Sequence, residues 1–156
     1  MTRPGTFPVK DLEATFPEEE VKIVIDRNGN PLKDDRGNPI PYLETHTVTE
    51  RLNQVFGGRW SFEIVKHEIG KSQLWVLGRL SAGGGTKEQF GSSEIKRKRE
   101  TGEVIDIGND LKAAASDALK KCASLMGVGL YLQDKGSRGQ DQGSVPPNGA
   151  PVATGP

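Results

Sequence analysis

The stretch NDLKAAASDALKKCASLMG, residues 109–127, decides the fold of this chain. Counted from Leu111, its apolar residues fall at offsets of 0, 3, 4, 7, 8, 11, 14 and 15, which is one face of a helix with a 3.6-residue period. We expect Asn109 or Asp110 to cap the first turn and Gly127 to end the last one. Several apolar positions are alanine, which lets the helix approach its cover closely, and we expect that cover to be a sheet.

Three strands are predicted ahead of this helix. They cover residues 59–69, 73–80 and 87–93, joined by a turn at 70–72 and by the glycine-rich residues 81–86, which we expect to form a flexible connection. The run Leu74-Trp75-Val76-Leu77 favours burial on both faces of the middle strand. Connections this short require antiparallel neighbours. The predicted fold class is α+β, an antiparallel three-stranded meander packed by a long helix in the order β-β-β-α.

Further elements flank this core. Alternating apolar residues predict a short strand over 21–25, followed by two turn phrases, residues 26–31 and 35–39, that favour a small hairpin or paired loops. A helix is expected over 45–56, with Thr47 and Glu50 at capping-box spacing and Gly57 at its end. After the long helix, the apolar run 128–132 is expected to add a strand.

Length and composition suit one domain with tails. The chain has 156 residues, of which only 33% are hydrophobic, and it contains 20 Gly and 10 Pro. We expect a flexible arm over 1–19, one folded domain over 20–133, and a disordered Gly/Pro-rich tail over 134–156. A single cysteine, Cys122, on the apolar helix face and the lack of a signal peptide or a long apolar run predict a cytoplasmic protein.

The formal net charge is zero, but the charges are unevenly placed. Residues 1–53 carry 7 basic and 10 acidic side chains, whereas residues 54–133 carry 12 and 9. Four consecutive cations, Lys96-Arg97-Lys98-Arg99, precede the long helix, which itself carries Lys112, Lys120 and Lys121. Loop and helix together can line one groove that follows a phosphate backbone. The alternative is a solvated basic loop that docks an acidic protein surface.

The motifs for catalysis and cofactor binding are missing from the sequence. Residues 83–87, GGGTK, lack the spacing of a phosphate loop, the two histidines and the cysteine do not have metal-ligand spacing, and no G-x-S-x-G is present. We therefore expect no enzyme activity, no cofactor and no metal. A metal-dependent nuclease is the less favoured alternative, and its candidate ligands are Glu94, Glu103, Asp106, Asp110 and Asp117. The strand aromatics Trp60, Phe62, Trp75 and Phe90 are interpreted as core and not as a base-stacking platform.

Three stretches of the chain resemble one known family. They are Tyr42-Leu43-Glu44-Thr45-His46-Thr47-Val48 with Asn53-Gln54-Val55-Phe56-Gly57 and Trp60, then Gly91-Ser92-Ser93-Glu94, and finally residues 117–127, DALKKCASLMG. Together they resemble the DNA-binding domain of the Rad-fifty-two/Rad-twenty-two single-strand annealing family, in its bacterial DNA damage response protein A branch. The resemblance spans about residues 42–132. It implies a β-β-β-α core that assembles as a ring of identical subunits, with single-stranded DNA in an outer groove.

The resemblance also implies which residues contact DNA. A family Lys-Arg pair on the long helix forms the floor of the groove, and Lys120 and Lys121 occupy its places, keeping the charge but losing the planar fork of arginine. Ser124 stands where the family has a further basic residue. The upper wall of the groove corresponds to Lys96, Arg97, Lys98 and Arg99. The nearest counterparts of a family arginine ahead of the Tyr42 motif are Lys33 and Arg36.

The function that these observations favour is non-enzymatic binding of single-stranded DNA in double-strand break repair. The protein would act as a homo-oligomeric ring that protects DNA ends and anneals complementary strands. Residues 20–133 would be the single-stranded DNA-binding and oligomerisation domain. Other repair proteins are expected partners of the tail, and no membrane is expected. The resemblance implies a nucleoid-associated protein of a bacterium or its phage. The alternatives are the partner-binding module that uses residues 96–99 and the nuclease.

Overall fold

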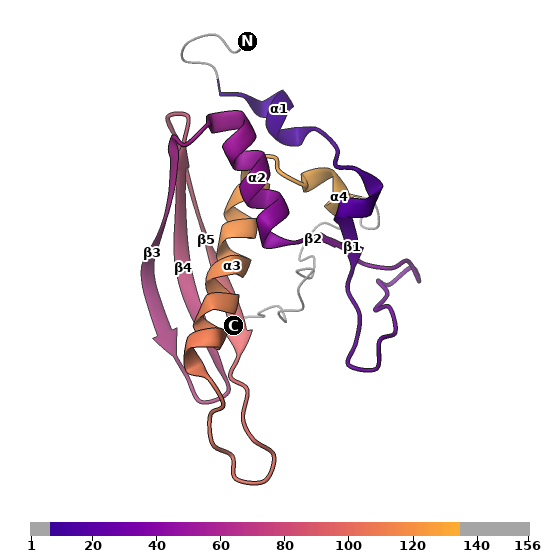
Figure 1. Cartoon of the computed structure of the whole chain (residues 1–156), viewed down its shortest axis with the longest axis vertical. Coiled ribbons are helices and arrows are strands. Elements are labelled where there is room, and N and C mark those ends of the chain that lie inside the picture. Colours follow the sequence, from indigo (N-terminus) through magenta and orange to yellow (C-terminus); the bar gives the residue numbers. More distant parts are fainter. Residues whose placement is uncertain (1–6, 135–156) are drawn as a thin grey trace.

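The computed structural model of the chain describes residues 7–134 and has a three-stranded antiparallel sheet with a long helix across one face (Figure 1). This arrangement confirms the predicted α+β class. The elements in chain order are α1 Val9–Glu13, η1 Glu18–Glu20, β1 Val21–Ile23, β2 Pro41–Leu43, α2 Thr45–Phe56, β3 Trp60–Ile69, β4 Gln73–Ala82, β5 Gly85–Glu94, α3 Ile107–Leu125 and α4 Leu130–Asp134.

The sheet has the order β3-β4-β5, and β4 pairs over its whole length with β5, from Gln73↔Glu94 to Ala82↔Gly85. The two strands are joined by Gly83 and Gly84 alone, whose φ values of 57° and 81° lie in the left-handed region. The expected flexible connection over 81–86 is therefore wrong. Because glycine adopts positive φ without steric cost, the glycine run makes a tight two-residue turn and the strands continue to it.

α3 begins and ends close to its predicted limits. Its cap is Asp106, whose side chain accepts a hydrogen bond from the Asn109 amide at 3.1 Å, so the predicted cap at Asn109 or Asp110 is wrong by a few residues. Gly127 follows the last turn with a φ of 116°, as expected for a glycine that ends a helix.

Small residues bring α3 directly onto the sheet. A Cβ added at Gly91 would lie 2.3 Å from the Ala114 carbonyl oxygen and 2.4 Å from the Ala118 nitrogen, and one added at Gly78 would lie 3.0 Å from the Ala118 Cβ. The close approach that the alanines predict is confirmed.

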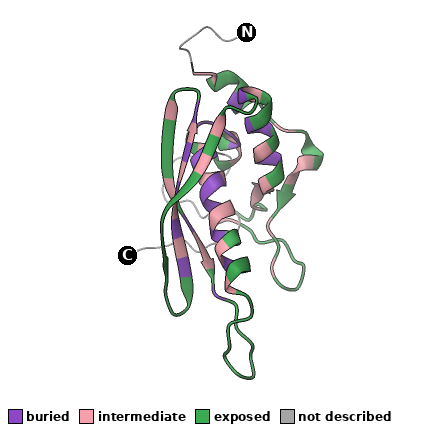
Figure 2. Cartoon of the chain, turned by 60° about the vertical axis from the view of Figure 1, so that its left-hand side comes forward, coloured by how far each residue is buried: buried purple, intermediate pink, exposed green. Residues whose placement is uncertain are grey.

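β4 alternates between a covered and an open face. Leu74, Val76 and Leu80 are buried on the side of α3, whereas Trp75 and Leu77 on the other side are only half-buried (Figure 2). Burial on both faces was predicted and is wrong, because none of the described elements covers the second face.

The N-terminal segment packs against the body from Phe7 onward. Leu12 of α1 is fully buried, and Arg51 of α2 donates to the carbonyl oxygens of Leu12 at 2.9 Å and Ala14 at 2.8 Å. The Arg51 guanidinium also stacks 3.8 Å from the centre of the Phe16 ring. The flexible arm expected over 1–19 is therefore wrong for the part that the structure describes.

Residues 24–40 form a projecting hairpin between the paired strands β1 and β2. Two aspartates each accept two backbone N–H groups, Asp26 from Asn28 and Asn30, and Asp34 from Arg36 and Asn38. These turns confirm the hairpin, although the second one starts at Asp34 and not at Asp35.

The remaining differences concern helix ends and the C-terminal side. α2 has its predicted limits, but its N-cap residue is Glu44 and no side chain caps it, so the capping box is wrong. The strand expected over 128–132 is wrong, because residues 130–134 form α4. The disordered tail predicted over 134–156 lies outside the described residues except for Asp134.

Candidate nucleic-acid interface

Lys121 is held on the β5 side of α3 by a buried carboxylate. The Asp117 Oδ2 atom lies 3.2 Å from the Lys121 Nζ and accepts the Ser92 backbone N–H at 3.0 Å. Asp117 is 2% exposed, whereas the Lys121 side chain keeps 29% of its surface exposed. An ammonium group has three donors, so Lys121 can hold this carboxylate and still bind a phosphate.

The basic loop, residues 95–106 between β5 and α3, has Lys96 as its first cation. Lys96 is held by a buried carboxylate in the same way as Lys121. The Asp110 Oδ2 atom accepts the Lys96 backbone N–H at 3.2 Å, and Asp110 Oδ1 lies 3.4 Å from the Lys96 Nζ. Asp110 is 1% exposed, and the Lys96 side chain is 59% exposed. Asp110 and Asp117 are seven residues apart, which is about 10 Å along a helix. The structure therefore brings Lys96 and Lys121 to one side of α3.

Lys120 lies on the adjoining side of α3, toward β2. Its Nζ donates to the Leu43 carbonyl at 3.2 Å and lies 5.5 Å from the centre of the Tyr42 ring. Burial lowers the pKa of Lys120, while the nearby carboxylates of Asp117 and Glu44 oppose that change. Lys120 thus joins α3 to β2 and keeps donor capacity beside Lys121.

The other cations of the basic loop have different roles. Arg97 donates to the carbonyl oxygens of Gly102 and Lys71, both at 2.9 Å, and so fixes the loop to the turn between β3 and β4. Lys98 lies 3.8 Å from Glu103. Arg99 is exposed at the tip. The loop projects beyond the sheet at the end where α3 begins (Figure 1).

Lys112 is separated from the other helix lysines. It lines a shallow, mostly apolar hollow of about 280 Å³ on the β3 side of α3, together with Ile64, His67, Val76, Leu111 and Ala115. Lys112 and Lys121 are nine positions apart, which turns the two side chains about 180° apart around the helix. The structure does not bring Lys112 together with Lys121.

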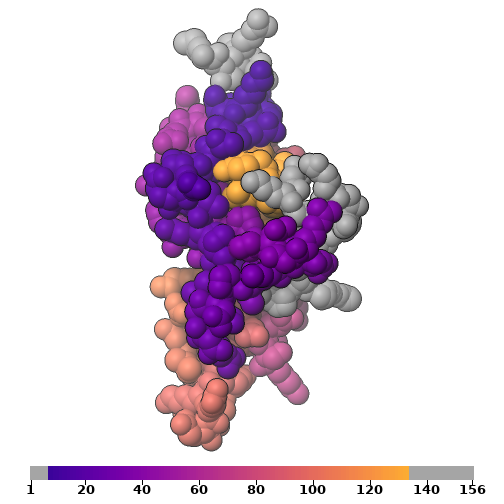
Figure 3. Space-filling view, turned by 90° about the vertical axis from the view of Figure 1, so that its right-hand side faces the viewer, coloured from indigo at the N-terminus to yellow at the C-terminus, as the bar shows by residue number. Residues whose placement is uncertain are grey.

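Lys33 and Arg36 lie on the exposed hairpin of residues 24–40. Figure 3 shows this hairpin and the basic loop on the same face of the molecule, with the hairpin above the loop. The hairpin that carries Lys33 and Arg36 is therefore visible on the same face as the basic loop.

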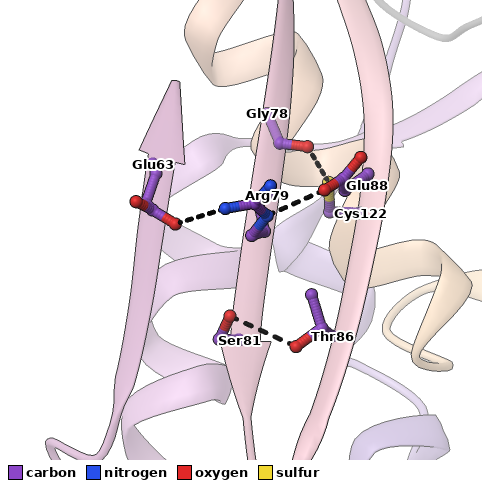
Figure 4. A network of polar contacts seen from close by, with 7 residues as sticks. All are labelled: Glu63, Gly78, Arg79, Ser81, Thr86, Glu88 and Cys122. Atoms are coloured by element: carbon purple, nitrogen blue, oxygen red, sulfur yellow. Dashed lines mark hydrogen bonds and ion pairs between the residues drawn. The ribbon is translucent and has the colours of Figure 1, made fainter. Parts of the chain in front are cut away.

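The open face of the sheet has a different charge. The strand register places Glu63, Glu68, Glu88 and Glu94 on it against Lys66 and Arg79, four acidic and two basic groups, which gives a net charge of −2. Figure 4 shows Arg79 between two of these carboxylates, with Nη1 3.2 Å from Glu63 and Nε 2.7 Å from Glu88. Trp75 and Phe90 meet edge to face on the same surface, with ring centres 5.3 Å apart. A net negative charge on this face is unfavourable for a phosphate backbone.

The five acidic residues considered as nuclease ligands do not gather at one place. Asp110 and Asp117 serve the two lysines, and Asp106 caps α3. Within residues 7–134, no group of three or more His, Cys, Asp or Glu side chains is placed to hold a metal ion. In the same part of the chain, none of the helices has the length and apolarity needed to cross a membrane.

Sequence reasoning missed the residues that organise the lysines. The sequence offers Asp110 as a helix cap or a metal ligand, Asp117 as a metal ligand, and Tyr42 and Leu43 as part of a resemblance, but none of them as a partner of a lysine. A signal was present for one pair, because Asp117 and Lys121 have the i, i+4 spacing of a helix ion pair. The contacts of Ser92 and Leu43 with α3 cross 25 and 77 residues of sequence and left no local signal.

Comparison with known proteins identifies the family of this chain. Residues 9–149 match the family model described as Rad52/22 family double-strand break repair protein. The chain is 36% identical over 126 residues to the single-stranded DNA-binding protein DdrA of Deinococcus deserti, an alignment that covers 80% of this chain and 56% of that protein. It is 35% identical over 95 residues to the protein of the same name from Deinococcus radiodurans, covering 61% of this chain and 40% of that protein.

The chain spans about half the length of the curated relatives it matches. The family match, however, covers most of the described residues, including the sheet, α3 and the basic loop between them. The chain belongs to the Rad52/22 family of double-strand break repair proteins.

Proposed function

We propose that this chain binds single-stranded DNA along the lysine flank, defined as Lys96, Lys98, Arg99, Lys120 and Lys121. The observation that carries the proposal is the placement of Lys96 and Lys121 on one side of α3, although 24 residues of sequence lie between them. The names of the two relatives, single-stranded DNA-binding proteins, support the choice of ligand. Lys33 and Arg36 extend the same side, whereas the position of Lys112 argues against a direct contact.

The mechanism is electrostatic and needs no catalyst. Lysines along the flank neutralise phosphates and release counterions, so the backbone is held while the bases stay free to pair. A bound backbone is shielded from nucleases, which protects DNA ends, and the free bases can pair, which allows complementary strands to anneal. The proposal includes no nucleotide hydrolysis and no metal.

The proposal includes assembly of identical subunits as a ring. The open sheet face supports self-association, because it presents Trp75, Leu77 and a Phe90 side chain that is 51% exposed. An apolar patch of this kind on a sheet marks a contact surface. A contact between this face and a different face of the next copy would be head-to-tail, which is the geometry that closes into rings.

Fluorescence anisotropy tests the DNA-binding proposal with labelled oligo-dT and a duplex of equal length, over a series of salt concentrations. We expect tighter binding of the single strand and a log-log salt slope of about −0.7 per phosphate contact. Lys121→Gln should weaken binding to all sequences alike. Lys112→Gln is the matched control, since it removes the same charge from the opposite side of the same helix.

Equal loss in the Lys121→Gln and Lys112→Gln variants would contradict the assignment of the lysine flank. Equal binding of the single strand and the duplex would instead favour the partner-binding module. Cleavage of the labelled strand on addition of Mg²⁺ would favour the nuclease. Light scattering and negative-stain images, with and without oligo-dT, test the ring separately, and a monomer under both conditions would contradict it.

A further inference from the structure

Two buried carboxylates on α3 make the same pair of contacts. Asp110 and Asp117 each accept one backbone N–H, from Lys96 and Ser92, and each lies within 3.4 Å of a lysine ammonium. Both backbone donors belong to the edge of β5 or its direct continuation, on the side where β5 has no neighbouring strand. The two aspartates therefore form a ladder between α3 and β5.

The ladder fixes the spacing of the two lysines. α3 runs antiparallel to β5, so the earlier aspartate meets the later strand residue and the later aspartate the earlier one. The aspartates are seven positions apart, a rise of about 10 Å along the helix, and Ser92 and Lys96 are four positions apart, about 13 Å along an extended chain. The contacts on the two elements therefore have similar spacing. Each ammonium group pairs with one of these two carboxylates.

Stability alone does not explain these carboxylates. A buried ion pair is often no more stabilising than well-packed apolar residues of similar volume, because both charges lose their water. α3 already packs on the sheet through Ala114, Ala118 and the glycines beneath them. The carboxylates orient the lysines, since each one holds an otherwise flexible lysine side chain on the β5 side of α3.

We infer that Asp110 and Asp117 are positioning residues for DNA binding, which order Lys96 and Lys121 before a phosphate arrives. This inference rests on the proposed function. A lysine that is already ordered loses less side-chain freedom on binding. The ammonium keeps donors for the phosphate while one is engaged by the carboxylate. The positioned ligand is one sugar-phosphate backbone with its phosphates presented along α3.

The first test compares Asp117→Asn with wild type by anisotropy with oligo-dT across a salt series. Asparagine keeps an acceptor for the Ser92 N–H but loses the charge that holds Lys121. We expect binding to weaken about 2- to 10-fold at each salt concentration, because Lys121 then loses more side-chain freedom on binding. Asp117→Asn combined with Lys121→Gln should have the same affinity as Lys121→Gln alone. Asp110→Asn with Lys96→Gln provides an independent second pair.

Two results of these titrations would overturn the inference. Tighter binding by Asp117→Asn would mean that Asp117 only weakens the local positive field. Unchanged binding with a lower unfolding midpoint would mean that Asp117 only joins α3 to β5. Absence of salt-dependent binding by the wild type would contradict the proposed function itself, which keeps the two failures distinct.

A measurement on the wild type needs no variant that could fail to fold. NMR relaxation of the lysine side chains in the free protein should show the Lys121 and Lys96 ammonium groups ordered relative to that of Lys112, which is exposed on the same helix. If all three were equally mobile, the carboxylates would not position the lysines and the inference would be wrong.

Discussion

Gly91 lies directly under the backbone of Ala118, and a Cβ at position 91 would come within 2.4 Å of the Ala118 nitrogen. Because the clashing atoms belong to helix backbone, they cannot rotate away. Gly91→Ala should therefore lower the free energy of unfolding by about 1–3 kcal/mol through overpacking. Urea denaturation measures the change. Gly58→Ala is the control, since a Cβ there meets no atom within 4 Å, and an equal loss in both variants would contradict this account.

Arg51 attaches the N-terminal segment to α2. Arg51→Met keeps the apolar stem but removes the donors to the Leu12 and Ala14 carbonyls and the stack on Phe16. With two carbonyls left unpaired, we expect a loss of about 2–4 kcal/mol in the free energy of unfolding. Hydrogen exchange should accelerate most in residues 9–16. The exposed Arg59, changed to Met, serves as control, and exchange that rises evenly over the whole chain would argue against a local role.

Arg97 and Arg99 are two residues apart but should respond differently to substitution. Arg97→Gln removes the donors that join the loop to Gly102 and Lys71, so we expect faster proteolysis between residues 96 and 105. Arg99→Gln should leave proteolysis unchanged and reduce the magnitude of the salt slope for oligo-dT by about 0.7. Limited proteolysis and anisotropy on the same samples separate the two effects. If Arg99→Gln left the slope unchanged, the tip of the loop would not contact DNA.

Lys120 should make stability depend on pH in the alkaline range. Burial lowers its pKa in the folded state below the usual 10.5, so in the interval between the two values the unfolded chain binds more protons. The free energy of unfolding then rises with pH across that interval. We measure the free energy of unfolding of wild type and Lys120→Met by urea denaturation at a series of pH values. The wild-type value minus the Lys120→Met value should rise as the pH approaches 10.5. A difference independent of pH would contradict this assignment.

The core of the fold could be predicted because its signals are local. The 3.6-residue period of residues 109–127, the limits of α2 and the order of the three strands all depend on neighbours in sequence. The glycine run was misinterpreted because three consecutive glycines fit both a flexible connection and a tight turn. Only the pairing of Ala82 with Gly85 distinguishes the two.

The site was predicted in composition but not in arrangement. Lys120 and Lys121 are consecutive, yet one contacts β2 and the other is held by Asp117, because successive helix residues point about 100° apart. The same geometry separates Lys112 from Lys121. The packing of residues 7–20 could not be inferred from their composition, since it depends on contacts of Arg51 with segments 37 to 39 residues away.

The covered face of β4 depends on an element that comes later in the chain. Leu74, Val76 and Leu80 are buried beneath α3, which begins only after the basic loop. Because the ribosome makes the chain from its N-terminus, the meander leaves the exit tunnel with these side chains still in contact with water and with neighbouring nascent chains. Translation must reach Leu125 before that surface is closed, so a stop or a pause within the basic loop would leave an aggregation-prone half-domain.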